Sequence, residues 1–193
     1  MSTRMGSLAR PFNPLSVGVG AEATFVARTQ DMDREHMQEP FRRAHEHQGA
    51  AFVEIYQNCN VFNNAAFDGV TGKSFRQENM IDLKHGEPIR FGPDGHKGVI
   101  MGSDGQLRIV EVAAVGEENV LVHDAHRSDP GLAFALARLS TDDHSPTPFG
   151  IFRDVLRGEY STMVDQQLAE ATKRKGPGEL SALLRGNGTW TVG

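Results

Sequence analysis

The sequence is poor in thiols: its 193 residues include one cysteine, Cys59. A single cysteine cannot form a disulfide within the chain, which excludes a disulfide-stapled scaffold and fits a reducing compartment. One thiolate also cannot hold an iron–sulfur cluster, which needs about four, unless other chain segments supply the rest.

Long apolar runs and concentrated positive charge are also missing. Residues 1–20 contain no apolar core followed by a cleavage site, and no segment approaches the roughly 20 apolar residues of a membrane span. The formal net charge is −5, and only the short "TKRK" at 172–175 is clustered, whereas a nucleic-acid surface needs a basic stripe. We therefore expect a soluble cytoplasmic protein that binds neither nucleic acid nor membrane.

The first third of the chain has the pattern of an α/β protein. Asn13 followed by Pro14 predicts the cap and first turn of a short helix over 14–20. The apolar segment "ATFVAR" at 23–28 then predicts a short buried strand.

A second helix is expected before Gly49, which supplies a left-handed stop. Asp31 or Asp33 can cap it, and Pro40 should kink or split it because proline cannot donate the helical hydrogen bond. Its apolar residues recur at helical spacing at Met37, Phe41 and Ala44. The sequence therefore predicts an interrupted amphipathic helix.

After Gly49, the segment "AAFVEIY" at 50–56 has the composition of an inner strand. A strand, a helix and a strand in this order imply parallel pairing, because the crossover returns the chain to the same end. Only two strands are recognisable before residue 60, so we expect other members of this sheet to lie outside the chain.

The residue pattern of the sequence changes near residue 70. Residues 90–113 alternate short strands with Pro-Asp-Gly and Ser-Asp-Gly turns, which is typical of a β-meander. A further strand is predicted over "VLVHDA" at 120–125, and "PFGIFRDV" at 148–155 is predicted to be a strand or an extended tail.

Helices are expected between and after these strands. Residues 128–140 predict a helix with Ser128 or Asp129 as its cap. The segment 160–186 predicts an amphipathic helix closed by basic residues and a glycine, followed by a shorter helix from Glu179.

Cys59 lies just past the end of the predicted strand, in "VEIYQNCNVFNN" at 53–64. Open α/β sheets place their ligand crevice at the carboxyl ends of parallel strands. The residue types leave three interpretations: a buried small apolar side chain, a catalytic nucleophile, or one ligand of an iron–sulfur cluster. A nucleophile would need a histidine or a cation beside it, and the flanking residues are amides.

Three other motifs carry weaker signals. "FDGVTGKS" at 67–74 ends like a Walker loop, but Phe67 replaces the first glycine, so a plain loop is predicted. "HEH" at 45–47 and "HDAH" at 123–126 lack a third well-placed metal ligand and are predicted to be surface histidines. "VGVGA" at 17–21 lacks the third glycine of a dinucleotide fingerprint.

Several segments together resemble one enzyme family, the β subunits of 2-oxoacid:ferredoxin oxidoreductases, most closely the 2-oxoglutarate type found in actinobacteria. The resemblance extends from Met5 to Gly193 without large gaps. The segments that carry it are "MGSLARPFNPLSVGVGAEATFVAR", "HEHQGAAFVEIYQNCNVFNNAAFD", "HGEPIRFG", "VHDAHRSDPGLAFALARLS" and "PFGIFR".

The resemblance implies a function. In this family the β subunit has a thiamine-diphosphate-binding α/β domain and works with an α subunit to decarboxylate a 2-oxoacid. Electrons leave through a [4Fe-4S] cluster to ferredoxin, and coenzyme A takes the acyl group. Cys59 matches the family's fourth cluster ligand, which is remote in sequence from the other three cysteines, so the resemblance implies that Cys59 binds both a cofactor and a metal.

The departures from the family are equally informative. The other three cysteines, and the Gly-Asp-Gly to Asn segment that holds Mg²⁺ and thiamine diphosphate, have no counterpart, since "PDG" at 93–95 and "SDG" at 103–105 are turns. The chain is therefore expected to start partway through the subunit. Residues 1–69 would be a partial thiamine-diphosphate-binding parallel sheet with helices, and residues 70–193 a C-terminal extension with a small β-meander and helices.

The leading expectation is thus part of an enzyme's β subunit, which is inactive alone. The alternative is a non-catalytic interaction module that docks on an α subunit or on a separate N-terminal half, because an incomplete sheet exposes strand edges. A third interpretation, an unrelated thiol enzyme, would require a lowered pKa and rapid alkylation of Cys59.

Overall fold

A computed structural model describes Leu8, residues 11–140 and 145–186, Gly188, Trp190 and Val192. The start of the first resembling segment, residues 5–7 and 9–10, lies outside the described residues. The chain forms two compact units, Met1–Leu156 and Arg157–Gly193, which are described separately. None of the helices in the described ranges is long and apolar enough to cross a membrane.

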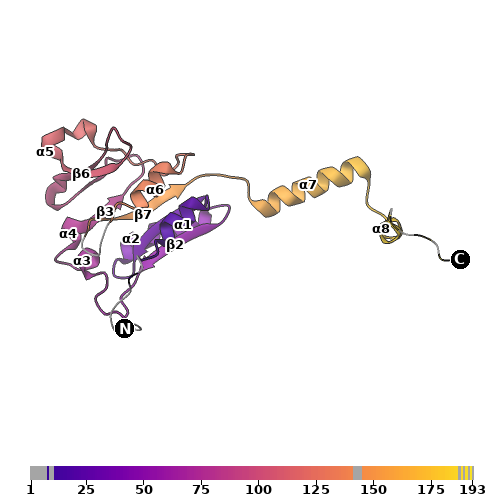
Figure 1. Cartoon of the computed structure of the whole chain (residues 1–193), viewed down its shortest axis with the longest axis horizontal. Coiled ribbons are helices and arrows are strands. Elements are labelled where there is room, and N and C mark those ends of the chain that lie inside the picture. The colour runs from indigo at the N-terminus through magenta and orange to yellow at the C-terminus, as the bar shows by residue number, and fades with distance from the viewer. Residues whose placement is uncertain are drawn as a thin grey trace. The chain divides into compact units, whose positions relative to one another are not determined.

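The first unit is built on a four-stranded sheet with strand order β2-β1-β7-β3 (Figure 1). β1 (Phe25–Gln30) pairs in parallel with β2 (Ala51–Tyr56), as the sequence predicted. On its other side β1 pairs antiparallel with β7 (Thr147–Asp154), which in turn pairs in parallel with β3 (Met80–Leu83). The predicted α/β class and the mostly parallel sheet are confirmed.

Two expectations about this sheet were wrong. β2, predicted to be an inner strand, lies at an edge of the described sheet. The other neighbour of β1 is not outside the chain but is β7, which pairs with it across more than a hundred residues. Strands from both sides of residue 70 therefore share one sheet, and the domain division at residues 69 and 70 stays a prediction.

Helix α1 (Pro14–Gly20) begins as predicted. The Oδ1 atom of Asn13 accepts a hydrogen bond from the Ser16 backbone N–H at 2.9 Å, which satisfies one free donor of the first turn. The Asn13 Nδ2 atom donates to the Ala137 carbonyl at 2.8 Å. This second bond ties α1 to α6 (Gly131–Ala137), a helix that the sequence also predicted.

Helix α2 (Arg34–Glu46) differs from its prediction in three ways. Pro40 lies inside a continuous helix and is buried, so it does not split the helix. The helix ends at Glu46 with an extended His47, three residues before the expected Gly49 stop. Phe41, assigned to the apolar face, is 44% exposed. Hydrogen bonds from polar side chains, rather than apolar burial, orient this helix on the sheet.

The hydrophobic core joins α1 and α6 to the sheet and to the meander. Its members are fully or almost fully buried, and they come from both halves of the first unit. They include Leu15, Val19, Val26, Ile81, Leu83, Ile89, Phe91, Val99, Leu132, Leu136 and Phe152. The meander is therefore part of the same packed body as the four-stranded sheet.

The predicted meander is confirmed as a three-stranded antiparallel sheet of β4 (Arg90–Phe91), β5 (Lys97–Met101) and β6 (Leu107–Glu111). The predicted strand at 120–125 is wrong. The backbone of residues 120–125 bonds two different neighbours. The Leu121 N–H donates to the Val99 carbonyl, and the His123 N–H donates to the Glu87 carbonyl. No ladder forms there beyond a single bridge between Pro88 and Val122.

The described part of the second unit, residues 157–186 with Gly188, Trp190 and Val192, contains two helices, both predicted. Helix α7 (Tyr160–Lys175) ends at Gly176, whose φ of +74° places it in the left-handed region. Helix α8 (Leu180–Arg185) follows Glu179. The remaining short elements are α3 (Asp68–Thr71), α4 (Arg76–Asn79), η1 (Pro93–Gly95), α5 (Val112–Val115) and η2 (Glu117–Asn119).

Candidate functional site

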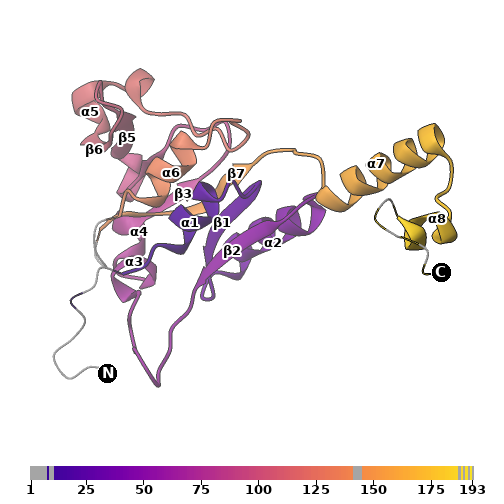
Figure 2. The same cartoon turned by 45° about the vertical axis from the view of Figure 1, so that its right-hand side comes forward.

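Cys59 lies in the loop that joins β2 to α3, which we call the Cys59 loop (residues 57–66). Figure 2 shows this loop extending away from the sheet beyond the end of β2. Cys59 is exposed, so the interpretation as a buried small apolar side chain was wrong. Its side chain is accessible to groups outside the described chain.

Backbone amides surround the Cys59 sulfur. Hydrogen bonds from the backbone N–H groups of Phe62 and Val61, and a weaker one from Asn63, lower the pKa of the Cys59 thiol and outweigh the opposing effect of burial. Such donors stabilise a thiolate, but they cannot accept its proton. The arrangement therefore suits a thiolate that binds a ligand better than one activated by a general base.

Asparagines close the Cys59 loop. The Oδ1 atom of Asn58 accepts a hydrogen bond from the Ala65 backbone N–H at 2.8 Å. The Nδ2 atom of Asn58 donates to the Oδ1 atoms of Asn60 at 2.8 Å and Asn64 at 3.0 Å. The Cys59 carbonyl accepts from the Asn63 N–H at 3.0 Å. Asn58 is therefore the residue that organises this turn.

Ala65 adopts a φ of +62°, in the left-handed region where a Cβ atom is unfavourable. Ala65→Gly should relieve this strain, and the gain should exceed the entropy that glycine costs. We expect the free energy of unfolding to rise by about 0.5 kcal/mol, measured by urea denaturation. The control is Ala66→Gly, because Ala66 has no positive φ to relieve. A rise in the free energy of unfolding for Ala66→Gly but not for Ala65→Gly would contradict this explanation.

The Cys59 site fits one ligand of an iron–sulfur cluster. An exposed thiolate with hydrogen bonds to its sulfur has the donor chemistry of such a ligand. Val61 and Phe62 beside it are each 82% exposed, so apolar surface is available to pack around a bound group. Over the described ranges, no group of three or more His, Cys, Asp or Glu side chains is arranged to hold a metal ion. The chain can thus supply one ligand of a larger set, and the ligand role of Cys59 stays a prediction.

The histidines of "HEH" and "HDAH" were predicted to lie on the surface, and two of them do not. The side chain of His47 is 1% exposed and contacts Thr24 and Asp154 through its two ring nitrogens, at 2.8 and 3.2 Å. His123 is 1% exposed, and its Nε2 atom donates to the Ile151 carbonyl at 2.7 Å. The His47 ring links the end of α2 to β7, and the His123 ring bonds the β7 backbone.

His123 should make folding sensitive to acid. Burial lowers the pKa of His123, assisted by His85 and His126 and opposed by Asp124 and the bond to Ile151. Its Nδ1 atom has no hydrogen-bond partner among the described residues, so a proton added there would be buried and unsatisfied. The unfolded chain therefore binds this proton more readily than the folded chain.

Because the folded pKa lies below the unfolded value of about 6.5, this contribution to stability is complete above pH 6.5 and is lost as the pH falls below it. The slope from this group should approach about 1.4 kcal/mol per pH unit. Urea denaturation between pH 7.5 and 5 should show a smaller slope for His123→Gln than for the exposed-site control His45→Gln. Equal slopes would contradict the prediction.

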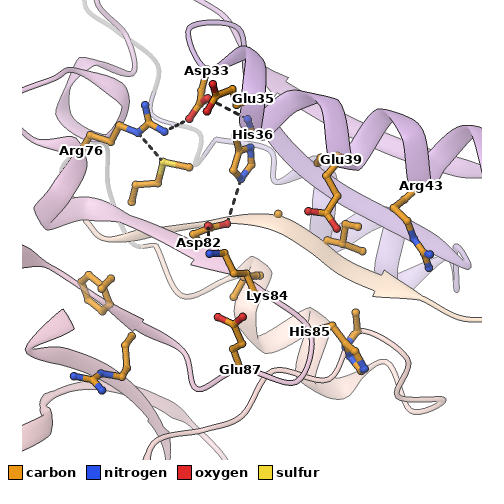
Figure 3. A pocket seen from close by; sticks show the side chains of 18 of the residues that line it. Asp33, Glu35, His36, Glu39, Arg43, Arg76, Asp82, Lys84, His85 and Glu87 are labelled. Atoms are coloured by element: carbon orange, nitrogen blue, oxygen red, sulfur yellow. Dashed lines mark hydrogen bonds and ion pairs between the residues drawn. The ribbon is translucent and has the colours of Figure 1, made fainter. Parts of the chain in front are cut away.

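A cavity of about 1070 Å³ lies between α2 and the segment around β3, with β7 contributing to its lining. No sequence motif predicted this cavity. His36 on α2 bonds the Thr29 hydroxyl at 3.0 Å and lies 3.5 Å from the Asp82 carboxylate on β3, while Asp33 pairs with Arg76 (Figure 3). Burial raises the pKa of Asp82, but His36 and Lys84 together outweigh this effect and lower the pKa.

These side-chain pairs in the cavity wall connect separate helices and strands. His36 connects α2 to β3, and Asp33 both caps α2 and holds Arg76 of α4. The predicted loop at 67–74 lies near the same wall and contains the short helix α3, so it is more regular than expected. Residues 73–75 separate its Gly72 from α4, and the element before Gly72 is the helix α3 and not a strand, so the Walker interpretation remains unsupported.

The known proteins to which this chain is similar include subunits of 2-oxoacid oxidoreductases. The 2-oxoglutarate oxidoreductase subunit KorB of Mycobacterium tuberculosis is 44% identical over 193 residues, which are 99% of this chain and 51% of that protein. The 2-oxoacid:ferredoxin oxidoreductase subunit beta of Saccharolobus solfataricus is 29% identical over 69 residues, 33% of this chain and 23% of that protein. No protein-family model matches the chain.

A solved structure supports the fold. The 2-oxoglutarate:ferredoxin oxidoreductase from Magnetococcus marinus, with 2-oxoglutarate, coenzyme A and succinyl-CoA bound, matches with a TM-score of 0.55 and 22% identity. The match covers 94% of this chain and 45% of that chain. The chain thus spans about half the length of KorB, the relative that matches nearly all of it. The resemblance inferred from the sequence is confirmed.

Proposed function

We propose that this chain, which is related along nearly its whole length to the β subunit of 2-oxoglutarate oxidoreductase, supplies part of such a subunit in a 2-oxoacid:ferredoxin oxidoreductase. The reaction would be the oxidative decarboxylation of a 2-oxoacid, with 2-oxoglutarate as the first candidate, to the acyl-CoA. An α subunit, coenzyme A and ferredoxin would be its partners.

Within that enzyme, Cys59 would be one thiolate ligand of a [4Fe-4S] cluster. The observation that carries this role is the exposed Cys59 sulfur in the loop that follows β2, where the N–H groups of Phe62 and Val61 lower the pKa of the thiol. The cluster would supply one-electron transfer. The chain's own residues would hold the sulfur in place, lower the pKa of its thiol and offer Val61 and Phe62 as apolar surface around it.

The other cofactors would be held elsewhere. Thiamine diphosphate and Mg²⁺ belong to the proposed complete enzyme, and the sequence contains no segment that matches their binding motif. The sheet formed by β1, β2, β3 and β7 would pack against the part of the subunit that binds them. In support, β2 is an edge strand whose Ile55 is 43% exposed.

A turnover assay tests the proposal. Combined with an α subunit and the remaining part of a β subunit, the chain should support reduction of a viologen dye that depends on both 2-oxoglutarate and coenzyme A. The 193-residue chain alone should give no reduction, because it provides one of about four cluster thiolates. Activity of the isolated chain, or none in the combination, would refute it.

A non-catalytic interaction module is the second candidate. Large apolar side chains are exposed on the Cys59 loop and along α7 and α8, including Val61, Phe62, Leu168, Leu180, Leu183 and Leu184. Exposed apolar surface of this kind favours a protein partner. This candidate predicts a stable complex with the α subunit and no dye reduction in any combination. A monodisperse monomer in light scattering, in the presence of that subunit, would count against it.

A further inference from the structure

The two ends of the Cys59 loop meet in one aromatic contact. Tyr56, the last residue of β2, and Phe67, just before α3, stack with ring centroids 4.1 Å apart and an interplanar angle of 22°. We call this pair the loop base. Loops of this size whose ends lie close together are compact units packed by their own side chains.

The Tyr56 side of the loop base is fixed to the sheet. The Arg28 guanidinium carbon lies 4.8 Å from the centre of the Tyr56 ring, and the Phe149 ring meets it edge-on at 5.3 Å. Arg28 is itself held by the Glu54 carboxylate at 2.7 Å and the Pro148 carbonyl at 3.1 Å. These contacts fix the Tyr56 ring on the sheet, and the Phe67 ring packs against it.

Inside the loop, one side chain connects the two arms. Asn58 bonds the Ala65 N–H from one arm to the other and also reaches Asn60 and Asn64. Between Asn58 and Ala65 the chain turns back on itself: the Asn63 N–H donates to the Cys59 carbonyl at 3.0 Å, and the N–H groups of Phe62 and Val61 lower the pKa of the Cys59 thiol. The direction of these N–H groups depends on the loop remaining closed at its base and across its middle.

We propose that Tyr56, Phe67 and Asn58 are positioning residues for Cys59, and that they hold the loop closed so that its sulfur is presented in one place with its N–H donors aligned. This inference rests on the proposed cluster-ligand role of Cys59. The contacts described above join the side chains of Tyr56, Phe67 and Asn58 to other parts of the loop and to the sheet, and not to the Cys59 sulfur. Each therefore acts through the loop backbone.

Hydrogen exchange on the 193-residue chain tests the closure directly. Phe67→Ala should speed exchange of the loop amides of Asn63 and Ala65 about tenfold, the scale of one aromatic pair and its burial. Phe67→Tyr should restore the wild-type rate because it keeps the ring. The matched control is Phe41→Ala, which removes the same atoms from an exposed site on α2 and should leave these amides unchanged.

The same variants in the complete complex test the link to the cluster. Phe67→Ala should lower the [4Fe-4S] content, read by electron paramagnetic resonance, several-fold, and Phe67→Tyr should recover it. Unchanged loop exchange, or normal cluster content with an opened loop, overturns the inference and leaves the proposed function intact. A wild-type complex that forms without a cluster overturns the proposed function, and the positioning role falls with it.

Discussion

Replacing Arg28 by methionine is expected to lower the free energy of unfolding by about 3 kcal/mol, because removing one partner of a buried ion pair leaves the other charge uncompensated. Arg28 is 3% exposed, and its Nε atom lies 2.7 Å from Glu54. The change would also leave the Pro148 carbonyl without this donor and remove the cation above the Tyr56 ring. Urea denaturation at pH 7 measures the loss.

Two controls separate the buried charge from other effects. Arg28→Met combined with Glu54→Gln should recover about 1 kcal/mol or more, since no buried charge then lacks a partner. Arg42→Met breaks the exposed pair with Glu46 and should cost no more than about 0.5 kcal/mol. A loss for Arg28→Met as small as that for Arg42→Met would show that the pair does not stabilise the sheet.

Gly150→Ala should be comparably severe, with an expected loss of about 3 to 4 kcal/mol. Gly150 lies in β7, between Arg28 of β1 and Leu83 of β3, and has a φ of +105°. A Cβ atom there would lie 2.7 Å from the Leu83 carbonyl oxygen, a backbone atom that cannot move without disturbing the β3–β7 pairing. Backbone strain and steric overlap therefore act together.

Gly20→Ala is the matched control for this prediction. Gly20 is the last residue of α1, and an added Cβ atom would meet nothing within 4 Å. Alanine favours a helix over glycine, so the free energy of unfolding should stay the same or rise slightly. If Gly150→Ala were tolerated as well as Gly20→Ala, the described geometry of β7 would be wrong.

The local parts of this fold could be predicted from the sequence because their causes are local. The Asn13 side chain caps α1 by bonding a backbone N–H three residues away. The turns of the meander come from glycines and an aspartate that adopt positive φ, such as Asp94 and Gly95. Signals of this kind are contained in a few consecutive residues.

The sheet order could not be predicted for the opposite reason. β1 pairs with β7 across more than a hundred residues, and no short pattern specifies which strands meet over that distance. The packed face of α2 was also missed, because Arg43 and His47 bond Asp154 of β7, a contact that exists only once the sheet has formed. The same contact explains why His47 is buried.

For the candidate site, the sequence predicted the place of Cys59 after β2 but not its surroundings. Exposure of the sulfur depends on how far the loop extends from the sheet, and that depends on the Asn58 bonds and on the contact between Tyr56 and Phe67. An aromatic residue at each end of an asparagine-rich segment was the available signal. The cavity beside α2 left no such signal, since its walls come from four separate parts of the chain.

The central claim is that Cys59 supplies one thiolate to a cluster shared with other chain segments. The most direct measurement is electron paramagnetic resonance of the reduced complex, purified without oxygen after co-expression of this chain with an α subunit and the remaining part of a β subunit. The wild-type complex should show a [4Fe-4S] signal, and Cys59→Ala should abolish it while the complex still assembles. A full signal in Cys59→Ala, or an assembled wild-type complex without any cluster, would contradict the account.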